Sequence, residues 1–263
     1  PATQKTVSNP MVSAPGEMSI QAHEVRQPSG RPLRVLMLHG EGSDAHLMEM
    51  SMQATRWTGH LESRVEFLYI EAPHSCDPKP EFHPAAVDAG LYDKQKYRSW
   101  GAIKPASLEE SIAAVMSKLD ELKPVDGIGG ICDGGLIAAL VASRRPELEL
   151  YLNIASSPIS RLPAGWTEAN WSISCESIHV ISPQDELLTM QELLDIPQHC
   201  IKAHLLQHDS GHSVPMLNGE LKRELVSVLS KIETLPDDLP ALSLPIAEKE
   251  FEIETGDAFT DVE

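Results

Sequence analysis

A glycine-dense turn constrains the fold of this chain more than any other feature of its sequence. The stretch VDGIGGICDGGLIAALVAS, residues 125–143, joins a short apolar run to a strong helix-forming segment. Gly130 and Gly134 stand two positions before and after Cys132. This is the spacing of a sharp strand-to-helix turn that carries a nucleophile, where a larger side chain at either glycine would clash with the nucleophile. The stretch therefore predicts a strand, a tight turn and a helix, with the Cys132 sulfur lifted into solvent.

A purely structural turn is the competing interpretation of the same residues. Cys132 would then be a small buried residue in a nucleotide-binding unit, with Gly127 and Gly129 supplying the glycine spacing. However, the strand before these glycines is short, and no acidic residue for a ribose follows at a suitable distance. We favour the nucleophile, because a helix N-terminus and a neighbouring histidine both promote the thiolate form of a cysteine.

Apolar runs and helix-forming segments alternate through the body of the chain. Buried strands are expected at 34–40, 65–73, 125–130 and 148–157, and at the starts of 178–188 and 203–215. Helices are expected at 44–61, 107–122, from the Cys132 turn to 143, and at 221–232, with a capping box formed by Ser107 and Glu110. This alternation predicts an α/β fold with a mostly parallel central sheet flanked by helices.

The chain divides into one folded domain with a tail on each side. We expect a flexible tail at 1–17, the α/β domain at 18–233 with a first strand near 18–25, and an acidic tail at 234–263. Residues 74–105 break the alternation and contain several prolines, which favours a lid-like insertion. The net charge is −18, and residues 233–263 hold ten acidic residues and one lysine. Such a charge excludes nucleic acid and anionic membranes as favoured partners.

Cysteine usage indicates a reducing compartment. The four cysteines form neither a CxxC pair nor a zinc-like cluster with histidines, and a disulfide scaffold of this length would carry more of them. No apolar run has the length of a transmembrane helix, and the first residues lack the apolar core of a signal peptide. We expect a cytoplasmic protein, or an organellar one after removal of a transit segment. A monomer and a homodimer both fit the sequence.

A nucleophilic cysteine requires a base, and the base requires an orienting acid. In a fold of this kind the chain order is nucleophile, acid, histidine. Asp185 follows the strand near 178, and His212 follows the strand near 203, so both lie at the carboxyl edge of the sheet. Asp185 has a simpler alternative role as the cap of a helix at 186–194. His208 competes with His212 as the base, although Gly211 and the Val-Pro pair around His212 favour a fixed turn there.

The loop His39-Gly-Glu-Gly42 follows the first buried strand and has the small residues of an oxyanion loop. We assign the backbone N–H groups of Glu41 and Asp133 to a developing oxyanion. An ordinary Gly-rich turn explains the loop equally well in isolation. The candidates for the walls of a substrate pocket are His39, Gly40, His74 and Trp100.

Four segments together resemble a known family. LMLHGEGSDAHLM, EAPH, GGICDGGLIAA and HDSGHSVP are similar to the fungal-type serine hydrolases, the α/β-hydrolase group that includes the human ovarian-cancer-associated serine hydrolase-like protein. The resemblance runs from about residue 34 to residue 229. It implies an α/β-hydrolase fold and hydrolysis of esters or thioesters without metal or cofactor. Carried over by position, the catalytic triad of the family falls on Cys132, Asp185 and His212.

Two departures from the family pattern shape the expected reaction. Cys132 stands where the family has serine, which resembles the cysteine elbow of dienelactone hydrolases, and Glu41 replaces an apolar residue. A thiolate leaves a tetrahedral intermediate more easily than an alkoxide, so the acyl group needs a good leaving group. We therefore expect a small-molecule thioester, aryl or enol ester, or lactone as substrate, cleaved through a thioester acyl-enzyme. The alternatives are a catalytically impaired binding protein and a redox-sensing thiol protein.

Overall fold

The computed structural model of the chain describes residues 31–77, 79, 87, 90, 97–164 and 171–234. Both expected tails, apart from residue 234, lie outside the described residues, as do the expected strand at 18–25 and half of the expected lid at 74–105. Among the residues described, no helix combines the length and the apolar character needed to cross a membrane.

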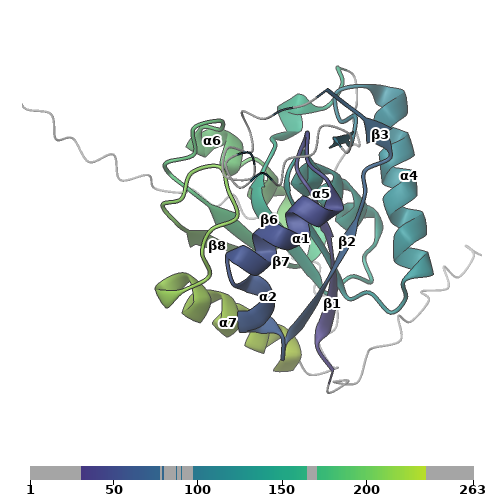
Figure 1. Ribbon diagram of the computed structural model, residues 1–263. Coiled ribbons are helices and arrows are strands. Elements are labelled where there is room, and N and C mark those ends of the chain that lie inside the picture. Colours follow the sequence, from purple (N-terminus) through teal and green to yellow (C-terminus); the bar gives the residue numbers. More distant parts are fainter. Residues whose placement is uncertain are drawn as a thin grey trace, which may run out of the picture.

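A six-stranded parallel sheet lies at the centre of the molecule (Figure 1). In chain order its strands are β1 (Leu33–Leu38), β2 (Val65–Ile70), β5 (Gly127–Cys132), β6 (Leu150–Ser156), β7 (Ile173–Ile181) and β8 (Cys200–Gln207). They lie in the order β2-β1-β5-β6-β7-β8, and every neighbouring pair is parallel. The predicted α/β fold with a mostly parallel sheet is thus confirmed. β7 starts earlier than the apolar run at 178 indicated.

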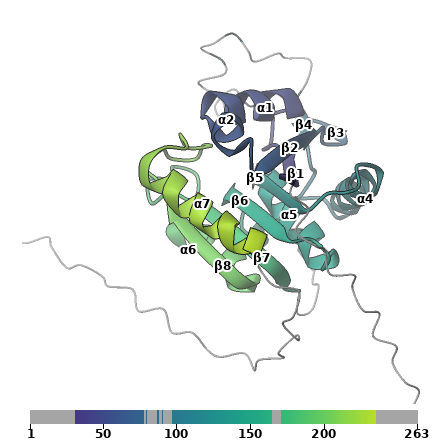
Figure 2. The ribbon, with the colours of Figure 1, turned by 90° about the horizontal axis from the view of Figure 1, so that it is seen from below.

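Helices cover both faces of the sheet, as Figures 1 and 2 show from two directions. One face packs against α1 (Ala45–Ala54), α2 (Trp57–Leu61) and α7 (Gly219–Thr234), and the other against α4 (Pro105–Glu121) and α5 (Asp133–Arg144). The alternation within β1 explains this layering. Val35 and Met37 point toward the face covered by α1, α2 and α7, and Leu36 and Leu38 point toward the face covered by α4 and α5. All four side chains are fully buried.

Two predicted helix boundaries are wrong. The segment 44–61 is two helices, because Arg56 adopts a left-handed conformation with φ of 68° between them. α4 begins at Pro105 after the N-cap Lys104, so Ser107 and Glu110 form no capping box at its start. Proline is well suited to the first helical position, because an N–H at that position would have no acceptor within the helix. A capping box does occur in this chain, but at Thr189, ahead of α6 (Met190–Leu193).

The two described ends of the segment predicted as a lid pair with each other and contact the loop after β1. β3 (His74–Ser75) and β4 (Arg98–Ser99) pair in antiparallel fashion. Arg98 also exchanges backbone hydrogen bonds with the loop after β1, accepting from Gly42 N at 3.1 Å and donating to Ser43 O at 3.0 Å. The base of the insertion therefore rests on the loop that was predicted to bind an oxyanion.

Candidate active site

Cys132 occupies a strained turn between β5 and α5. It is the last residue of the strand and the N-cap of the helix, with φ of 54° and ψ of −129°. A positive φ is rare for a residue with a side chain and marks a conformation that the surrounding structure must enforce. The two flanking glycines make it possible, since a Cβ at Gly130 would lie 2.6 Å from the backbone of Gly134. A Cβ at Gly134 would likewise lie 2.3 Å from the backbone oxygen of His39. Both positions thus leave no room for a side chain, but the atoms that exclude it belong to neighbouring backbone and not, as predicted, to the nucleophile.

Gly127 and Gly129 have a different role from the one a nucleotide-binding turn would give them. Both lie inside β5, next to β6. A Cβ at Gly127 would lie 2.9 Å from Leu150 O, and a Cβ at Gly129 would lie 2.4 Å from Leu152 O. These glycines allow β5 and β6 to approach closely beneath the helix. The nucleotide-binding interpretation of the glycine spacing is therefore wrong.

The side chain of Cys132 is half-buried rather than fully lifted into solvent. Its sulfur forms a 3.7 Å hydrogen bond with the Oγ atom of Ser157, which follows β6. Ser157 also donates its N–H to the carbonyl oxygen of Cys132 at 3.0 Å. Ser157 had no predicted role in the site, although its place at the end of the predicted buried strand at 148–157 was a usable signal.

Asp185 and His212 are bonded to each other from two different loops. His212 Nδ1 lies 2.8 Å from Asp185 Oδ2, and the Asp185 side chain is inaccessible to solvent. The other oxygen, Oδ1, accepts the backbone N–H groups of Leu187 and Leu188, each at 2.9 Å. Asp185 thus orders the turn after β7, and its Oδ2 remains directed at the imidazole. It does not cap a helix at 186–194, because α6 begins only at Met190.

A glycine fixes the loop that carries His212. Gly211 has φ of 64°, and a Cβ there would lie 2.5 Å from an oxygen of Glu186. The same Glu186 oxygen accepts the N–H of His212 at 3.1 Å. Farther along the loop, Trp57 of α2 donates its Nε1–H to Pro215 O at 2.8 Å. The fixed turn that was predicted around His212 is present in this form.

The environment of His212 strongly favours its protonated form. Burial alone would lower the pKa of this histidine, but the hydrogen bond with Asp185 and the neighbouring Cys132 sulfur raise it to about 10. The pKa of Asp185 is lowered, because the hydrogen bonds from His212 and two amides outweigh the effect of burial. His212 Nε2 is buried without an aligned hydrogen-bond partner among the described residues. The effect of the Cys132 sulfur on the pKa of His212 places the two groups close together, and the sulfur also contacts Ser157 Oγ.

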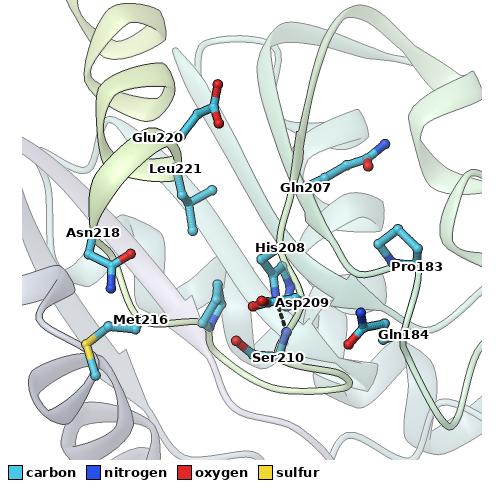
Figure 3. A pocket seen from close by; sticks show the side chains of 11 residues that line it. Pro183, Gln184, Gln207, His208, Asp209, Ser210, Met216, Asn218, Glu220 and Leu221 are labelled. Atoms are coloured by element: carbon cyan, nitrogen blue, oxygen red, sulfur yellow. Dashed lines mark hydrogen bonds between the residues drawn. The ribbon is translucent and has the colours of Figure 1, made fainter.

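His208 lies on a different side of the same loop. Its Nδ1 accepts the N–H of Ser210 at 3.1 Å, and burial lowers its pKa. It lines an open cavity of about 490 Å³ between the turn after β7 and the start of α7, shown in Figure 3. Neither Cys132 nor His212 lines this cavity. Of the two histidines that competed as the base, His212 is the one bonded to Asp185.

The loop after β1 packs directly against the nucleophile turn. A Cβ at Gly40 would lie 3.3 Å from the Cβ of Cys132. His39 is fully buried behind the loop, where its Nε2 accepts the N–H of Ala72 at 3.1 Å and its Nδ1 therefore donates to Gly40 O at 2.8 Å. Trp100 is also fully buried and donates to His39 O at 2.7 Å. Both residues hold the loop in place and do not form the wall of an open pocket.

Two carboxylates and one guanidinium surround the nucleophile turn. Asp133 is buried, accepts a short hydrogen bond from Ser157 Oγ and lies 3.6 Å from the half-exposed Arg161. Burial raises the pKa of Glu41, and the nearby Asp133 charge raises it further, whereas Arg161 lowers it. Arg161 was not predicted, and its position in a short 3₁₀ turn at Ile159–Arg161 gave no sequence signal.

The remaining pocket candidate, His74, lies at the base of the insertion. Its Nε2 is 3.1 Å from Ser107 O and 3.7 Å from a Glu110 oxygen, so the ring packs against the start of α4. Within the described part of the chain, no three His, Cys, Asp or Glu side chains are grouped as a metal site would require.

Comparisons with known proteins agree with this geometry at the level of family and fold. A family model described as serine hydrolase (FSH1) matches residues 29–223. Esterase OVCA2 of Danio rerio is 28% identical over 214 residues, covering 71% of this chain and 92% of that protein. Human esterase OVCA2 is 28% identical over 208 residues, covering 70% and 90%. The crystal structure of Arabidopsis thaliana SOBER1 superposes with a TM-score of 0.51 at 16% identity, covering 76% of this chain and 99% of that one.

Proposed function

The chain belongs to the FSH1 serine hydrolase family of α/β-hydrolases that act on esters or thioesters, and from this premise we propose that it cleaves activated acyl compounds with a cysteine nucleophile. The observation that carries the proposal is the hydrogen bond between His212 and Asp185 beside the Cys132 sulfur. Relatives in the comparison are named esterases, which supports the acyl substrate class.

Each side chain has a defined task in the proposed reaction. His212 takes the proton of the Cys132 thiol at Nε2, and Asp185 holds the imidazole through Nδ1 and stabilises the imidazolium. The thiolate attacks the acyl carbon, and the leaving group departs with the proton returned by His212. Water activated by His212 then hydrolyses the thioester and frees the sulfur.

The oxyanion of each tetrahedral intermediate is assigned to two backbone N–H groups. Asp133 is the first residue of α5, where amides lack intrahelical acceptors and the helix dipole favours negative charge. Glu41 follows Gly40, whose contact with Cys132 brings this loop to the reacting atom. The loss of one such donor costs about 2.7–4 kcal/mol of transition-state stabilisation in a related setting.

Sulfur chemistry narrows the proposed substrate to compounds with good leaving groups. After attack, the weaker base departs from the tetrahedral intermediate, and a thiolate departs in preference to an alkoxide. Thiolates, phenolates and enolates compete well with the enzyme sulfur, whereas simple alkoxides do not. We therefore propose thioesters, aryl or enol esters, and lactones of small molecules as substrates.

The test is hydrolysis of matched aryl, thio and alkyl esters by the wild type and by Cys132→Ala, His212→Ala and Asp185→Asn. We expect aryl and thio esters to be cleaved well ahead of the alkyl ester. Cys132→Ala and His212→Ala are expected to lower kcat/KM by on the order of 10³-fold or more. Unchanged turnover in both alanine variants would overturn the mechanism. Tight ligand binding without turnover in the wild type would favour the alternative of a binding protein.

We further propose a cytoplasmic location and a compact domain at 18–233 that acts as a monomer or homodimer. All four cysteines are free, which supports a reducing compartment. Fractionation of cells tests the cytoplasmic location, and light scattering of the purified protein tests whether it is a monomer or a homodimer.

A further inference from the structure

The end of β6 makes a tight bend against the nucleophile turn. Ala155 has φ of 45°, although it is not glycine and is completely buried. Such a conformation persists only where surrounding contacts enforce it. Beyond the bend, Ser157 N donates to Cys132 O at 3.0 Å, and Ser157 Oγ lies 3.7 Å from the Cys132 sulfur. The contacts that hold Ala155 in this conformation therefore also hold Ser157 against Cys132.

Asn153 bridges the bend from inside the sheet. Its side chain is buried, and its Oδ1 accepts the N–H of Ser156 at 2.9 Å, across the strained Ala155. A backbone N–H can only donate, so this bond identifies the oxygen of the amide. The Nδ2 group of Asn153 then faces Nδ1 of His179, its neighbour on β7, at 3.0 Å. Because Nδ2 donates, His179 Nδ1 accepts, and the ring hydrogen lies on Nε2.

The far end of the same line of hydrogen bonds is fixed by β8. Ser177 Oγ donates to the backbone oxygen of Lys202 at 2.7 Å, so it accepts the Nε2–H of His179 at 3.1 Å. Each bond from β8 to the bend thus has one direction. A protonated His179 would turn a second N–H toward the Nδ2 hydrogens of Asn153. In agreement, burial lowers the pKa of His179 to about 3, and the charge of His204 lowers it further.

We propose that Asn153 is a positioning residue for catalysis, because the bend that its amide holds sets Ser157 against Cys132 and thereby fixes the position of the sulfur. His179 in turn orients the amide. Asn153 acts through the backbone and Ser157, and it has no chemical part in the reaction. This inference rests on the proposed role of Cys132 as nucleophile. It assigns a purpose to a buried polar line that the proposed reaction does not otherwise use.

The test compares hydrolysis of an aryl ester by the wild type and by Asn153→Ala. Without the amide, the bend loses its buried hydrogen bond, and the sulfur moves relative to the acyl carbon. A misplacement of about 1 Å costs about 10²-fold in rate, so we expect kcat to fall about 10- to 100-fold while KM stays within about twofold. A kcat in Asn153→Ala equal to that of the wild type would overturn the proposal.

Ser177→Ala is the matched control. It removes a completely buried partner from the same line, but the bonds that join Asn153 to Ser156 and to His179 remain. Urea denaturation is expected to show a loss of stability in both variants, whereas kcat should fall only in Asn153→Ala. A parallel fall of kcat in both variants would show that Asn153 serves the stability of the core alone, which contradicts the proposal.

Asn153→Asp provides an independent readout if Asn153→Ala does not fold. A carboxylate still accepts the Ser156 N–H, but it cannot donate to His179 Nδ1. The line is then complete only when one added proton is shared between the carboxylate and that nitrogen. The ring of His179 has Tyr151 packed edge-on at 5.7 Å and His204 as the neighbouring titratable group.

The activity of Asn153→Asp should therefore depend on pH in a way that the wild type does not share. We expect kcat to approach the wild-type value in acidic solution and to fall as the added proton leaves with rising pH. The ratio of the two kcat values separates this titration from that of the catalytic groups. A ratio that stays constant between about pH 5 and 9 would contradict the inference.

Failure of the proposed function can be told apart from failure of this inference. If the wild type hydrolyses no ester, the rate at which iodoacetamide alkylates Cys132 replaces kcat as the readout. A severalfold change of this rate in Asn153→Ala, with none in Ser177→Ala, then supports the positioning role, and equal rates in all three proteins overturn it. Ester hydrolysis with an unchanged kcat in Asn153→Ala leaves the proposed function standing and removes the inference.

Discussion

At the scale of single residues, the pairing of His212 with Asp185 links protonation to stability. The folded state raises the pKa of His212 from 6.5 to about 10 and lowers that of Asp185 below 3.8. The stabilisation from His212 is therefore complete below about pH 6.5 and is lost as the pH rises through about 10. The stabilisation from Asp185 is present above about pH 4 and is lost in more acidic solution.

We predict that Asp185→Asn lowers the free energy of unfolding by about 1.5–3 kcal/mol at pH 6, because it removes a charged hydrogen bond while keeping the side-chain volume. The difference from the wild type should shrink steadily between pH 6.5 and 10. Urea denaturation of both proteins at a series of pH values measures it. A difference that stays constant over this range would show that His212 does not carry the predicted proton.

At the scale of elements, the nucleophile turn depends on backbone segments that approach too closely to leave space for a side chain at Gly134. A Cβ at Gly134 would lie 2.3 Å from His39 O and 2.5 Å from Leu38 O, both of which are backbone atoms that cannot move aside easily. We predict that Gly134→Ala destabilises the protein by about 1–3 kcal/mol and removes most of the activity. Thermal unfolding and ester hydrolysis measure the two effects.

Gly59→Ala is the control for this prediction. Gly59 is exposed within α2, and no heavy atom lies within 4 Å of the Cβ that alanine would add. Alanine is the better helix former, so we expect a gain in stability of about 0.5–1 kcal/mol with unchanged hydrolysis. Equal effects of the two substitutions would mean that the turn tolerates a side chain.

The loop that carries His212 is anchored to α2 by Trp57. We predict that Trp57→Phe costs about 1–3 kcal/mol of stability, because Pro215 O loses its donor in a buried site. It should also lower kcat more than it raises KM, since the loop places the catalytic base and not the substrate. Trp171→Phe, which alters a ring stacked on His199, serves as the control and should leave kcat unchanged. A normal kcat in Trp57→Phe would contradict this anchoring role.

Elements with a strong local signal were predictable, and those set by distant contacts were not. β1 was evident because an uninterrupted apolar run suits a strand buried on both faces, and Gly130 and Gly134 marked the turn at Cys132. The helix break at Arg56 could not be predicted, because no residue near it in the sequence indicates a left-handed backbone conformation for this arginine. The burial of His39 depends on Ala72 and Trp100, which come from other parts of the chain. The candidate site residues and the pairing of His212 with Asp185 could thus be predicted from chain order, whereas the contacts of Ser157, Arg161 and His39 could not.

At the scale of the whole molecule, the central sheet, both hydrophobic cores and the candidate site lie between residues 31 and 234. The acidic segment that follows carries much of the net charge of −18. We predict that a chain ending at residue 234 keeps the melting temperature and the kcat/KM of the full chain within about twofold. Calorimetry and aryl ester hydrolysis compare the two. A marked loss of either would assign the segment a part in folding or catalysis.

The central claim is that Cys132 forms a covalent acyl-enzyme, and mass spectrometry of the protein quenched during turnover of an aryl ester tests it most directly. We predict a mass increase equal to the acyl group on the peptide that contains Cys132, removable by hydroxylamine as a thioester is. The adduct should be absent from Cys132→Ala. An acyl group found on another residue, or steady turnover in Cys132→Ala without any adduct, would contradict the account.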